Sequence, residues 1–597
     1  MDSSWDLIRL IWASFLTILV AVGQLAFHYH LALLVFVLLS SLALAQFGTR
    51  NVVKWPLVVI IMSLIFAELG AYVLIRLLVH GFEAFFYTSK AQNLRKQMQK
   101  STIYEDWLKV AHRLDRLKGL DKWLRDSSSD SRYNWSLIQS LAQQMRFHRT
   151  KGEPEKILQV FSQCTRKNLG GIWKEKLYSV SHTGRTKDAV HAFVEEVEKS
   201  MQWLGDHSPK LSSEMLGHTI KFMTRVQKSY GKTGLFLSGG ASNGNYHWGI
   251  IDALLKQDCF PEYLSGTSAG AVVVSLLGTR TDEELKSILN TGELVQRLTC
   301  FDEDAFTCLS RLYKSGSLFS RKQWVEKIKW FTQGDTTFQE AFERTGRVIN
   351  INVSEAGEHG QPVMLNHDTT PNVVIFSAVI ASAAMSIFVK PQQLLVKRAD
   401  GKVVPRHAKS VEQFVDGCFQ RDVPIREMSE LYNIRFSIVS QVNPHMVPFH
   451  FRGQGEAGAP SRWRRRTGGW RGGFLLSAFE MMLKIDMKKN LLILDRLGLV
   501  NEDNIGATSL FLQNFDGDIT LVPPIRAMDY FKLISDPGAD LKRYCQVGSR
   551  ITWKKLPMLK LRLAIERAVE RCIESLKKEA KCRQLKTEDS KSLDETI

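Results

Sequence analysis

Two long apolar runs occupy the N-terminal part of the chain. Residues 11–47 contain no Asp, Glu, Lys or Arg, and only His28 and His30 interrupt them. A second run covers residues 56–79 and is broken by Glu68 and Arg76. Since a helix needs about 20 apolar residues to cross a bilayer, the pattern predicts membrane-embedded helices and leaves the number of crossings open. The first run is too long for the apolar core of a secretory signal peptide.

The pattern changes sharply after the second apolar run. Residues 90–100 (KAQNLRKQMQK) are basic, and a basic flank favours the cytosolic side of a membrane. Residues 101–230 then show amphipathic helical spacing, with helices predicted at 135–147, 153–164 and 187–204 and a capping box at Thr102 and Glu105 opening an earlier one. We expect a helical domain without catalytic residues that joins the membrane anchor to the rest of the chain.

A glycine-rich turn follows the first clear strand signal. Residues 235–237 (LFL) predict a short strand, residues 238–244 (SGGASNG) a turn, and residues 247–256 a helix. Such a turn exposes backbone N–H groups that can hold a phosphate or a developing oxyanion. Neither a P-loop nor a dinucleotide-binding site is indicated, because no Lys-Ser/Thr pair follows the turn and no acidic residue ends a second clear strand about 20 residues on.

A second glycine motif lies shortly downstream, where Gly266, Ser268 and Gly270 form a Gly-x-Ser-x-Gly pattern. A short strand signal precedes it and a helix of small residues, 271–277, follows. This arrangement is typical of a nucleophile elbow, in which small neighbours let the serine hydroxyl stand exposed on a strained turn. The helix N-terminus favours negative charge beside it. Together with the upstream turn, the motif predicts that Ser268 is a catalytic nucleophile.

A serine hydroxyl needs a group that accepts its proton. His359, His367 or His445 could complete a triad, because all three follow the serine in the chain. Asp416 could instead form a dyad, since a predicted strand at 414–415 ends at Asp416 and Gly417. The residues alone leave both arrangements open.

Several longer segments resemble one family. LSGGASNGNYHWG, GTSAG, and VDG followed by RDVPIREMSELYNIRFSIVSQVNPH are similar to the patatin-like acyl hydrolases, and more closely to the triacylglycerol lipases of the yeast and plant storage-oil (sugar-dependent) type. TFQEAFERTGRVININVS, NVVIFSAVIASAA and RKNLGGIWKEKLY add to the resemblance. It covers residues 90–450, with a fainter echo at 516–577.

The resemblance implies a role for each matching residue. Ser268 is the nucleophile and Asp416, followed by Gly417, is its general base, so that the histidines are not catalytic. The elbow glycines are Gly266 and Gly270, and the expected oxyanion-hole residues are Gly239, Gly240, Ala241 and Gly244. No cofactor and no metal is expected.

Four residues depart from the family pattern. Ala241 stands where a third glycine is common, Cys418 replaces a small residue after Asp-Gly, and Met385-Ser386 replaces a Pro-Gly pair. These changes affect the shape of the expected pocket more than the chemistry.

The resemblance also implies the substrate. We expect hydrolysis of triacylglycerol at the lipid droplet or endoplasmic reticulum surface, with the catalytic domain facing the cytosol. A phospholipase, a lysophospholipid acyltransferase and a non-catalytic lipid-droplet scaffold are the alternatives. His247 and Asp252 match an acyltransferase spacing, but residues five apart lie about 500° around a helix and do not share a face.

Composition narrows the expected partners. The chain of 597 residues has 79 Lys and Arg against 61 Asp and Glu, a net charge of +18, which favours anionic surfaces. The strip 462–471 (RWRRRTGGWR) suits anionic headgroups. Nucleic acid is the rival partner and is not expected, because no nucleic-acid module accompanies the strip. The alternative without a binding function is a disordered insertion. The eight cysteines lack Cys-x-x-Cys spacing, which argues against a zinc site or a disulfide framework.

The predicted fold class is α/β, with a patatin-like three-layer α/β/α hydrolase core behind a helical N-terminal domain and membrane-embedded helices. The predicted segments are a membrane anchor (1–88), the helical domain (89–230), the catalytic core (231–450), an Arg/Trp/Gly-rich insertion (451–474), a C-terminal helical completion of the core (475–577) and a polar, disordered tail (578–597). Within the fifth segment we expect helices at 475–499 and 552–576 and a strand at 516–522.

Overall fold

A computed structural model of the chain describes residues 49–86, 89–164, 168–303, 305–357, 360–385, 388–406, 412–446, 456–458, 473–497, 513 and 515–594. The chain divides into two compact units. Unit 1 consists of Met1–Phe86 and Arg471–Leu512, and unit 2 consists of Tyr87–Trp470 and Gln513–Ile597. The first apolar run, residues 11–47, lies outside the described residues.

In the described part of unit 1, the helices α2 (Thr49–Phe86) and α20 (Gly473–Arg496) pack against each other. Within α2, Pro56–Ile75 is long and apolar enough to cross a membrane, with a mean hydropathy of 2.5. The Asn490 side chain donates to Glu68 at 3.3 Å, and the Lys484 ammonium lies 4.7 Å from the Tyr72 ring centroid. The prediction that 475–577 completes the core is therefore wrong for α20, because its partner is α2.

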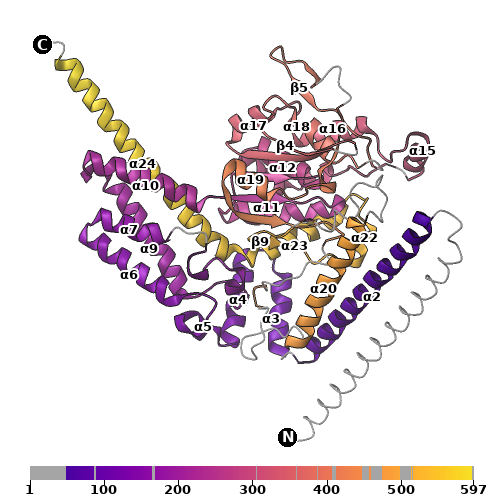
Figure 1. The fold of residues 1–597 in the computed structure, drawn as a ribbon, viewed down its shortest axis with the longest axis horizontal. Helices are drawn as coiled ribbons and strands as arrows, with labels where there is room; N and C mark the ends of the chain where they lie inside the picture. Colours follow the sequence, from indigo (N-terminus) through magenta and orange to yellow (C-terminus); the bar gives the residue numbers. More distant parts are fainter. Residues whose placement is uncertain are drawn as a thin grey trace, which may run out of the picture. The chain divides into compact units, whose positions relative to one another are not determined.

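The N-terminal part of unit 2 is helical, as the sequence predicts (Figure 1). Its helices are α3 (Ser89–Lys100), α4 (Tyr104–Leu117), α5 (Leu120–Arg125), α6 (Trp135–Lys151), α7 (Pro154–Cys164), α8 (Glu175–Tyr178), α9 (Asp188–Asp206) and α10 (Ser213–Tyr230). The predicted capping box is wrong: Ile103 precedes α4 and no side chain caps the helix. Capping boxes occur instead at Thr281 with Glu284 and at Thr337 with Glu340.

The rest of unit 2 is built on a seven-stranded sheet in the order β4-β3-β2-β1-β8-β9, with β7 also paired to β3. Strands β3, β2, β1, β8 and β9 are parallel, whereas β4 and β7 run antiparallel to β3. The bounds are β1 (Lys232–Leu237), β2 (Tyr263–Gly266), β3 (Val348–Glu355), β4 (Pro362–Leu365), β7 (Phe414–Asp416), β8 (Ile434–Ser440) and β9 (Ile519–Leu521). A separate hairpin pairs β5 (Leu395–Lys397) with β6 (Val403–Pro405).

Apolar helices cover this sheet. Helix α12 packs on β1, β2 and β3, α18 on β3 and β7, and α19 on β8 and β1. The bounds are α11 (Tyr246–Lys256), α12 (Ala269–Thr279), α13 (Asp282–Thr291), α14 (Glu293–Arg297), α15 (Ala305–Ser315), α16 (Arg321–Phe331), α17 (Phe338–Thr345), α18 (Ile375–Ser382) and α19 (Ile425–Tyr432). Helices α12 and α18 are buried along most of their length, as expected of helices between a sheet and a further layer. The fold class is confirmed as α/β with a helical N-terminal region.

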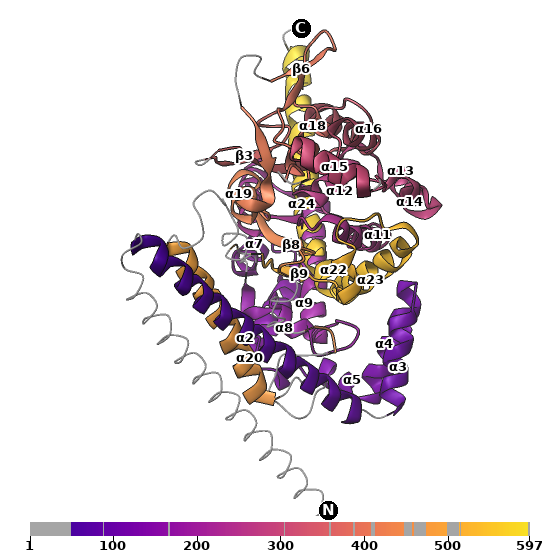
Figure 2. The same cartoon turned by 90° about the vertical axis from the view of Figure 1, so that its right-hand side faces the viewer.

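Unit 2 closes with α22 (Ala527–Phe531), α23 (Leu541–Trp553) and α24 (Leu556–Asp594). The predicted helix 552–576 is interrupted between α23 and α24. Helix α24 packs along α9 and α10 and stays helical to Asp594 (Figures 1 and 2), so the expectation of a disordered tail from 578 onward is wrong. Leu559, Val569 and Leu576 are buried on its inner side.

The crossing of α11 and α23 depends on a glycine. A Cβ on Gly249 would lie 1.9 Å from the carbonyl oxygen of Cys545, whereas Gly217 in α10 has no atom within 4 Å of that position. We predict that Gly249→Ala destabilises the protein by about 3 kcal/mol or more through overpacking. Gly217→Ala, the matched control, should stabilise it by up to about 1 kcal/mol. Equal unfolding temperatures for the two variants would contradict this packing.

Candidate active site

Ser268 sits at the junction of β2 and α12, as the motif predicts. Its backbone has φ 53° and ψ −118°, a region that costs a non-glycine residue of order 1–3 kcal/mol and that clusters at functional sites. The Ser268 amide donates to the Ser382 hydroxyl at 2.9 Å, and that hydroxyl donates to the Asn352 carbonyl at 2.6 Å. Ser268 as a whole is half-buried.

The elbow positions 266 and 270 require glycine, because neighbouring backbone atoms approach them closely. A Cβ on Gly270 would lie 2.2 Å from the Leu237 carbonyl oxygen, and one on Gly266 would lie 2.4 Å from that of Gly270. Gly244, in the turn after β1, faces the first residue of α12: its Cβ would meet that of Ala269 at 2.7 Å. The glycine turn and the nucleophile elbow therefore pack directly against each other at the carboxyl ends of β1 and β2, which are neighbours in the sheet.

The glycine turn offers two free backbone donors. Gly240 and Ala241 have φ 149° and φ 50°, and within the described residues neither amide donates a hydrogen bond. Ala241 thus adopts a left-handed conformation that favours glycine. Gly239 was expected among the oxyanion donors, but its amide already donates to Asp422 Oδ1 at 2.8 Å. That expectation is corrected: Gly239 anchors the turn.

Asp416 ends β7, next to Val353 of β3. It is 1% exposed, and its Oδ1 accepts a hydrogen bond from the Cys418 amide at 2.8 Å. Burial raises the pKa of Asp416 to about 6, although the Cys418 amide and the Ser268 hydroxyl act in the opposite direction. Its Oδ2 is buried without a full hydrogen bond in the described part of the chain. A carboxylate with a strongly perturbed pKa beside a half-buried serine is a typical arrangement for proton transfer.

A second buried carboxylate, Asp422, was missed by the sequence analysis. Besides the Gly239 amide, it accepts hydrogen bonds from Asn443 Nδ2 at 2.6 Å and from the Cys418 thiol at 3.3 Å. Its carbonyl accepts from the Thr267 hydroxyl at 2.7 Å. Burial raises the pKa of Asp422 to about 7, with hydrogen bonds opposing and the charge of Asp416 adding to the rise. Asp422 therefore ties the glycine turn to the elbow.

The signal for Asp422 was present but indirect. Asp422 and Asn443 lie in the segments quoted for the family resemblance, each shortly after a strand at the carboxyl edge of the sheet. Polar residues at that edge are candidates for a site. Their pairing, however, depends on which strands are neighbours, and a single sequence does not show this.

Cys418 lies between the two carboxylates. Burial raises the pKa of its thiol well above its usual value, and Asp416 and Asp422 add to this effect. A Cβ on Gly239 would lie 2.3 Å from its sulfur, so the larger side chain that replaces the usual small residue is accommodated by that glycine. Of the Met385-Ser386 pair, Ser386 lies outside the described residues; just before it, the Ala384 carbonyl accepts the Asp416 amide at 3.2 Å.

The described histidines have other contacts. His367 stacks on Phe342 with ring centroids 4.0 Å apart, and His445 lies 6.0 Å from the Phe515 ring; His359 is outside the described residues. His247 is buried between the Ser440 hydroxyl (2.7 Å) and the Ser238 carbonyl (3.0 Å), and burial lowers its pKa to about 4. Asp252 pairs with Lys256 at 2.8 Å, so His247 and Asp252 do not act together.

Two further expectations concern other chemistry. Within the described ranges, no group of three or more His, Cys, Asp or Glu could hold a metal ion. The basic strip 462–471 lies outside the described residues; from the surrounding insertion only 456–458 are described, and there Glu456 pairs with Lys554 at 2.7 Å.

Comparison with known proteins identifies the family of this chain. The model of the patatin-like phospholipases matches residues 235–429, and a domain of unknown function (DUF3336) matches residues 84–227. A patatin-like phospholipase domain-containing protein of Neosartorya fischeri is 35% identical over 538 residues, covering 87% of this chain and 74% of the relative. The chain belongs to the patatin-like phospholipase family. The matched range contains Ser268, Asp416 and Asp422.

Some relatives of this patatin-like protein are considerably longer than the chain itself. A patatin-like phospholipase domain-containing protein of Cryptococcus neoformans is 36% identical over 532 residues, covering 89% of this chain and 60% of the relative. Among solved structures, VipD from Legionella pneumophila matches 35% of this chain and 50% of that chain, with 15% identity and a TM-score of 0.22. The ExoU type III effector matches 43% and 53%, with 14% identity and a TM-score of 0.19.

The burial of Asp416 should make the stability of the folded protein depend on pH. The pKa of Asp416 is raised from 3.8 to about 6 in the folded protein. Between these pH values the carboxyl group ionises in the unfolded chain but keeps its proton in the folded one. The free energy of unfolding therefore falls as pH rises through this interval. The shift corresponds to about 3 kcal/mol at higher pH. Asp416→Asn keeps an acceptor for the Cys418 amide, and should raise the unfolding temperature at pH 8 but not at pH 4. A lower unfolding temperature for the variant at pH 8 would contradict this.

Proposed function

We propose that this protein is a serine acyl hydrolase that cleaves fatty-acyl esters of triacylglycerol, with Ser268 as nucleophile and Asp416 as general base. The observation that carries the proposal is the strained, half-buried Ser268 next to a carboxylate, Asp416, that is buried and incompletely hydrogen-bonded. Membership of a lipid-hydrolase family supports ester hydrolysis. Histidine is not required for the reaction.

The first half-reaction forms an acyl-enzyme. The ester carbonyl lies against Ser268, and Asp416 Oδ2 accepts the hydroxyl proton as Oγ attacks the carbonyl carbon. The carbonyl oxygen becomes an oxyanion, which the free amides of Gly240 and Ala241 stabilise. Such preorganised donors contribute typically 100-fold to 1,000-fold each to turnover. The proton on Asp416 then passes to the leaving alkoxide, and diacylglycerol departs.

The second half-reaction regenerates the serine. Water attacks the acyl carbon, Asp416 accepts a proton from it, and the same amides hold the second oxyanion. Collapse of this intermediate breaks the bond to Oγ, which recovers its proton from Asp416, and fatty acid is released. A carboxylate with a pKa near 6 suits this dual role, because it is ionised at neutral pH yet basic enough to accept a proton.

The proposed substrate rests on the resemblance to storage-oil lipases and on the apolar helix of unit 1. Triacylglycerol collects in lipid droplets and between bilayer leaflets, so an enzyme anchored in the endoplasmic reticulum or droplet membrane with its catalytic unit in the cytosol can reach it. The net charge of +18 favours anionic headgroups at that surface.

A phospholipase is the second candidate, favoured by the family and by the names of the relatives, which refer to phospholipase domains. The same dyad would cleave either ester, since the chemistry at the carbonyl is identical. The acyltransferase alternative loses its basis, because His247 and Asp252 have separate partners.

Release of fatty acid from emulsified triolein tests the proposal. We predict that Ser268→Ala and Asp416→Asn each lower the rate by at least about 1,000-fold, while His367→Gln and His445→Gln change it less than about 2-fold. The wild-type rate should rise with pH through about 6, where the pKa of Asp416 lies, because only the ionised carboxylate accepts the proton. Faster release from phosphatidylcholine would favour the phospholipase, and full activity of Ser268→Ala would refute the hydrolase.

The contacts of Asp422 predict that this residue positions the glycine turn. Asp422→Asn can still accept the Gly239 amide but sets an NH₂ group against that of Asn443, so the glycine turn should shift. A shift of about 1 Å costs on the order of 100-fold, and we expect kcat on p-nitrophenyl butyrate to fall about 10-fold to 100-fold with little change in KM. Asp252→Asn is the matched control and should keep full kcat. An unaltered kcat for Asp422→Asn would show that this carboxylate does not position the turn.

A further inference from the structure

The segment around α22 presents large apolar side chains to solvent. Met528 is 61% exposed, Phe531 84% and Ile534 47%, all within seven residues. Single exposed apolar residues are common on proteins, but several together, one of them a Phe, mark an interaction surface. We call Met528, Phe531 and Ile534 the apolar tip.

Cations flank the apolar tip. Arg526, Lys532 and Lys542 are exposed, and Lys532 pairs with Asp540 at 2.6 Å on a part-exposed site. Apolar side chains surrounded by Lys and Arg suit the boundary between acyl chains and headgroups, because the apolar groups enter the acyl region while the cations stay among phosphates. The proposed substrate is insoluble in water, so the enzyme must in any case work against such a boundary.

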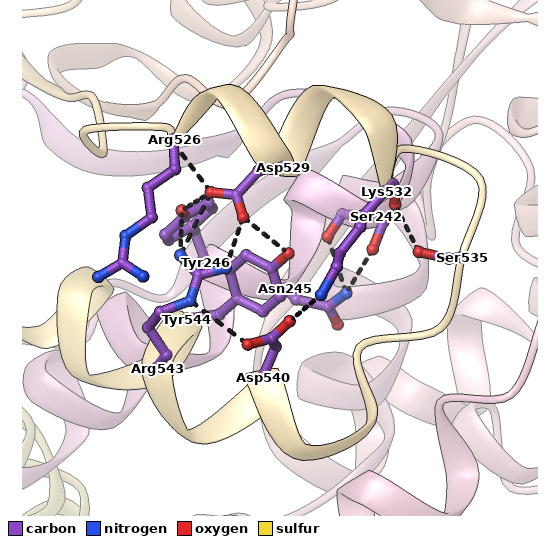
Figure 3. A network of polar contacts seen from close by, with 10 residues as sticks. All are labelled: Ser242, Asn245, Tyr246, Arg526, Asp529, Lys532, Ser535, Asp540, Arg543 and Tyr544. Atoms are coloured by element: carbon purple, nitrogen blue, oxygen red, sulfur yellow. Dashed lines mark hydrogen bonds and ion pairs between the residues drawn. The ribbon is translucent and has the colours of Figure 1, made fainter.

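The inner side of the same segment is fixed by a buried charge network (Figure 3). Asp529 is 2% exposed and accepts hydrogen bonds from the Tyr246 hydroxyl at 2.8 Å and from Arg543 at 2.5 Å. The Arg526 amide donates to it at 3.0 Å. Burial alone would raise the pKa of Asp529, but these hydrogen bonds lower it, so the carboxylate stays ionised at neutral pH.

This network reaches the glycine turn. Tyr246 begins α11 directly after the turn, and its ring packs edge-on against Tyr544 with centroids 4.7 Å apart. The Ser242 amide donates to the Leu533 carbonyl at 3.1 Å, and Ser242 is adjacent to Ala241. Residues 526–535 thus carry the apolar tip on one side and hold the proposed oxyanion donors on the other.

The geometry points to the apolar tip as a lipid-docking element: it inserts into an anionic phospholipid-coated surface and holds the glycine turn, and with it Ser268, against that surface. The choice of a lipid surface rests on the proposed function, because that function supplies the lipid substrate. Docking itself is measurable without catalysis. It predicts that the tip is needed for insoluble esters and not for soluble ones.

Quenching by lipid tests docking directly. In full-length Cys582→Ser protein, which removes the exposed thiol, a dye is attached at Phe531→Cys or, as control, at Phe147→Cys; Phe147 is also exposed and lies in α6. The protein is reconstituted in phosphatidylcholine vesicles with and without phosphatidylserine, using lipids brominated in the acyl chains. We expect quenching at 531, stronger with phosphatidylserine, and none at 147. Equal quenching at both positions, or none at 531, overturns the proposal.

Kinetics provide the second readout. Phe531→Ser should lower the rate of hydrolysis of emulsified triolein about 10-fold, because the variant loses the free energy of burying one aromatic ring in the lipid. The rate of hydrolysis of p-nitrophenyl butyrate in detergent should stay within 2-fold of the wild-type rate. Phe147→Ser should change neither rate. Equal losses on both esters would reveal a structural role and overturn lipid docking. If wild type cleaves neither ester, the hydrolase proposal fails, while the quenching experiment still decides whether the apolar tip docks.

Discussion

The site depends on a backbone contact that leaves no room for side chains. The elbow at the end of β2 and the glycine turn at the end of β1 meet where Gly270 faces the Leu237 carbonyl and Gly244 faces Ala269. Only this approach brings the free amides of Gly240 and Ala241 to the same edge as Ser268. A methyl group at either glycine would push the two turns apart, and interiors at native packing density absorb such displacement poorly.

Two buried carboxylates lie at this edge, and we propose a different role for each. Asp416 is incompletely hydrogen-bonded and acts next to the Ser268 hydroxyl, which suits a group that gains and loses a proton. Asp422 is saturated by the Gly239 amide, the Asn443 side chain and the Cys418 thiol, which suits a structural anchor. The two proposed roles thus follow from how many hydrogen-bond donors each carboxylate receives.

The sequence predicted local features well and long-range ones poorly. The strand–turn–helix units around Gly240 and Ser268 follow from residue spacing, because turn and elbow chemistry is local. The occupied amide of Gly239 was not foreseeable, since its acceptor, Asp422, lies 183 positions away. For the same reason α20 was assigned to the core: its sequence indicates a helix, but not that α2 is its partner. The helical end of α24 was missed because its residues are polar, and a polar composition resembles disorder.

Activation of Ser268 by Asp416 can be measured without any lipid surface, as the rate of covalent labelling. A fluorophosphonate probe reacts with an activated serine, and mass spectrometry identifies the modified residue. We expect labelling at Ser268 only, with a rate that increases as pH rises through about 6 and that falls at least about 100-fold in Asp416→Asn. Labelling of Asp416→Asn at the wild-type rate, or of a residue other than Ser268, would contradict activation of Ser268 by Asp416.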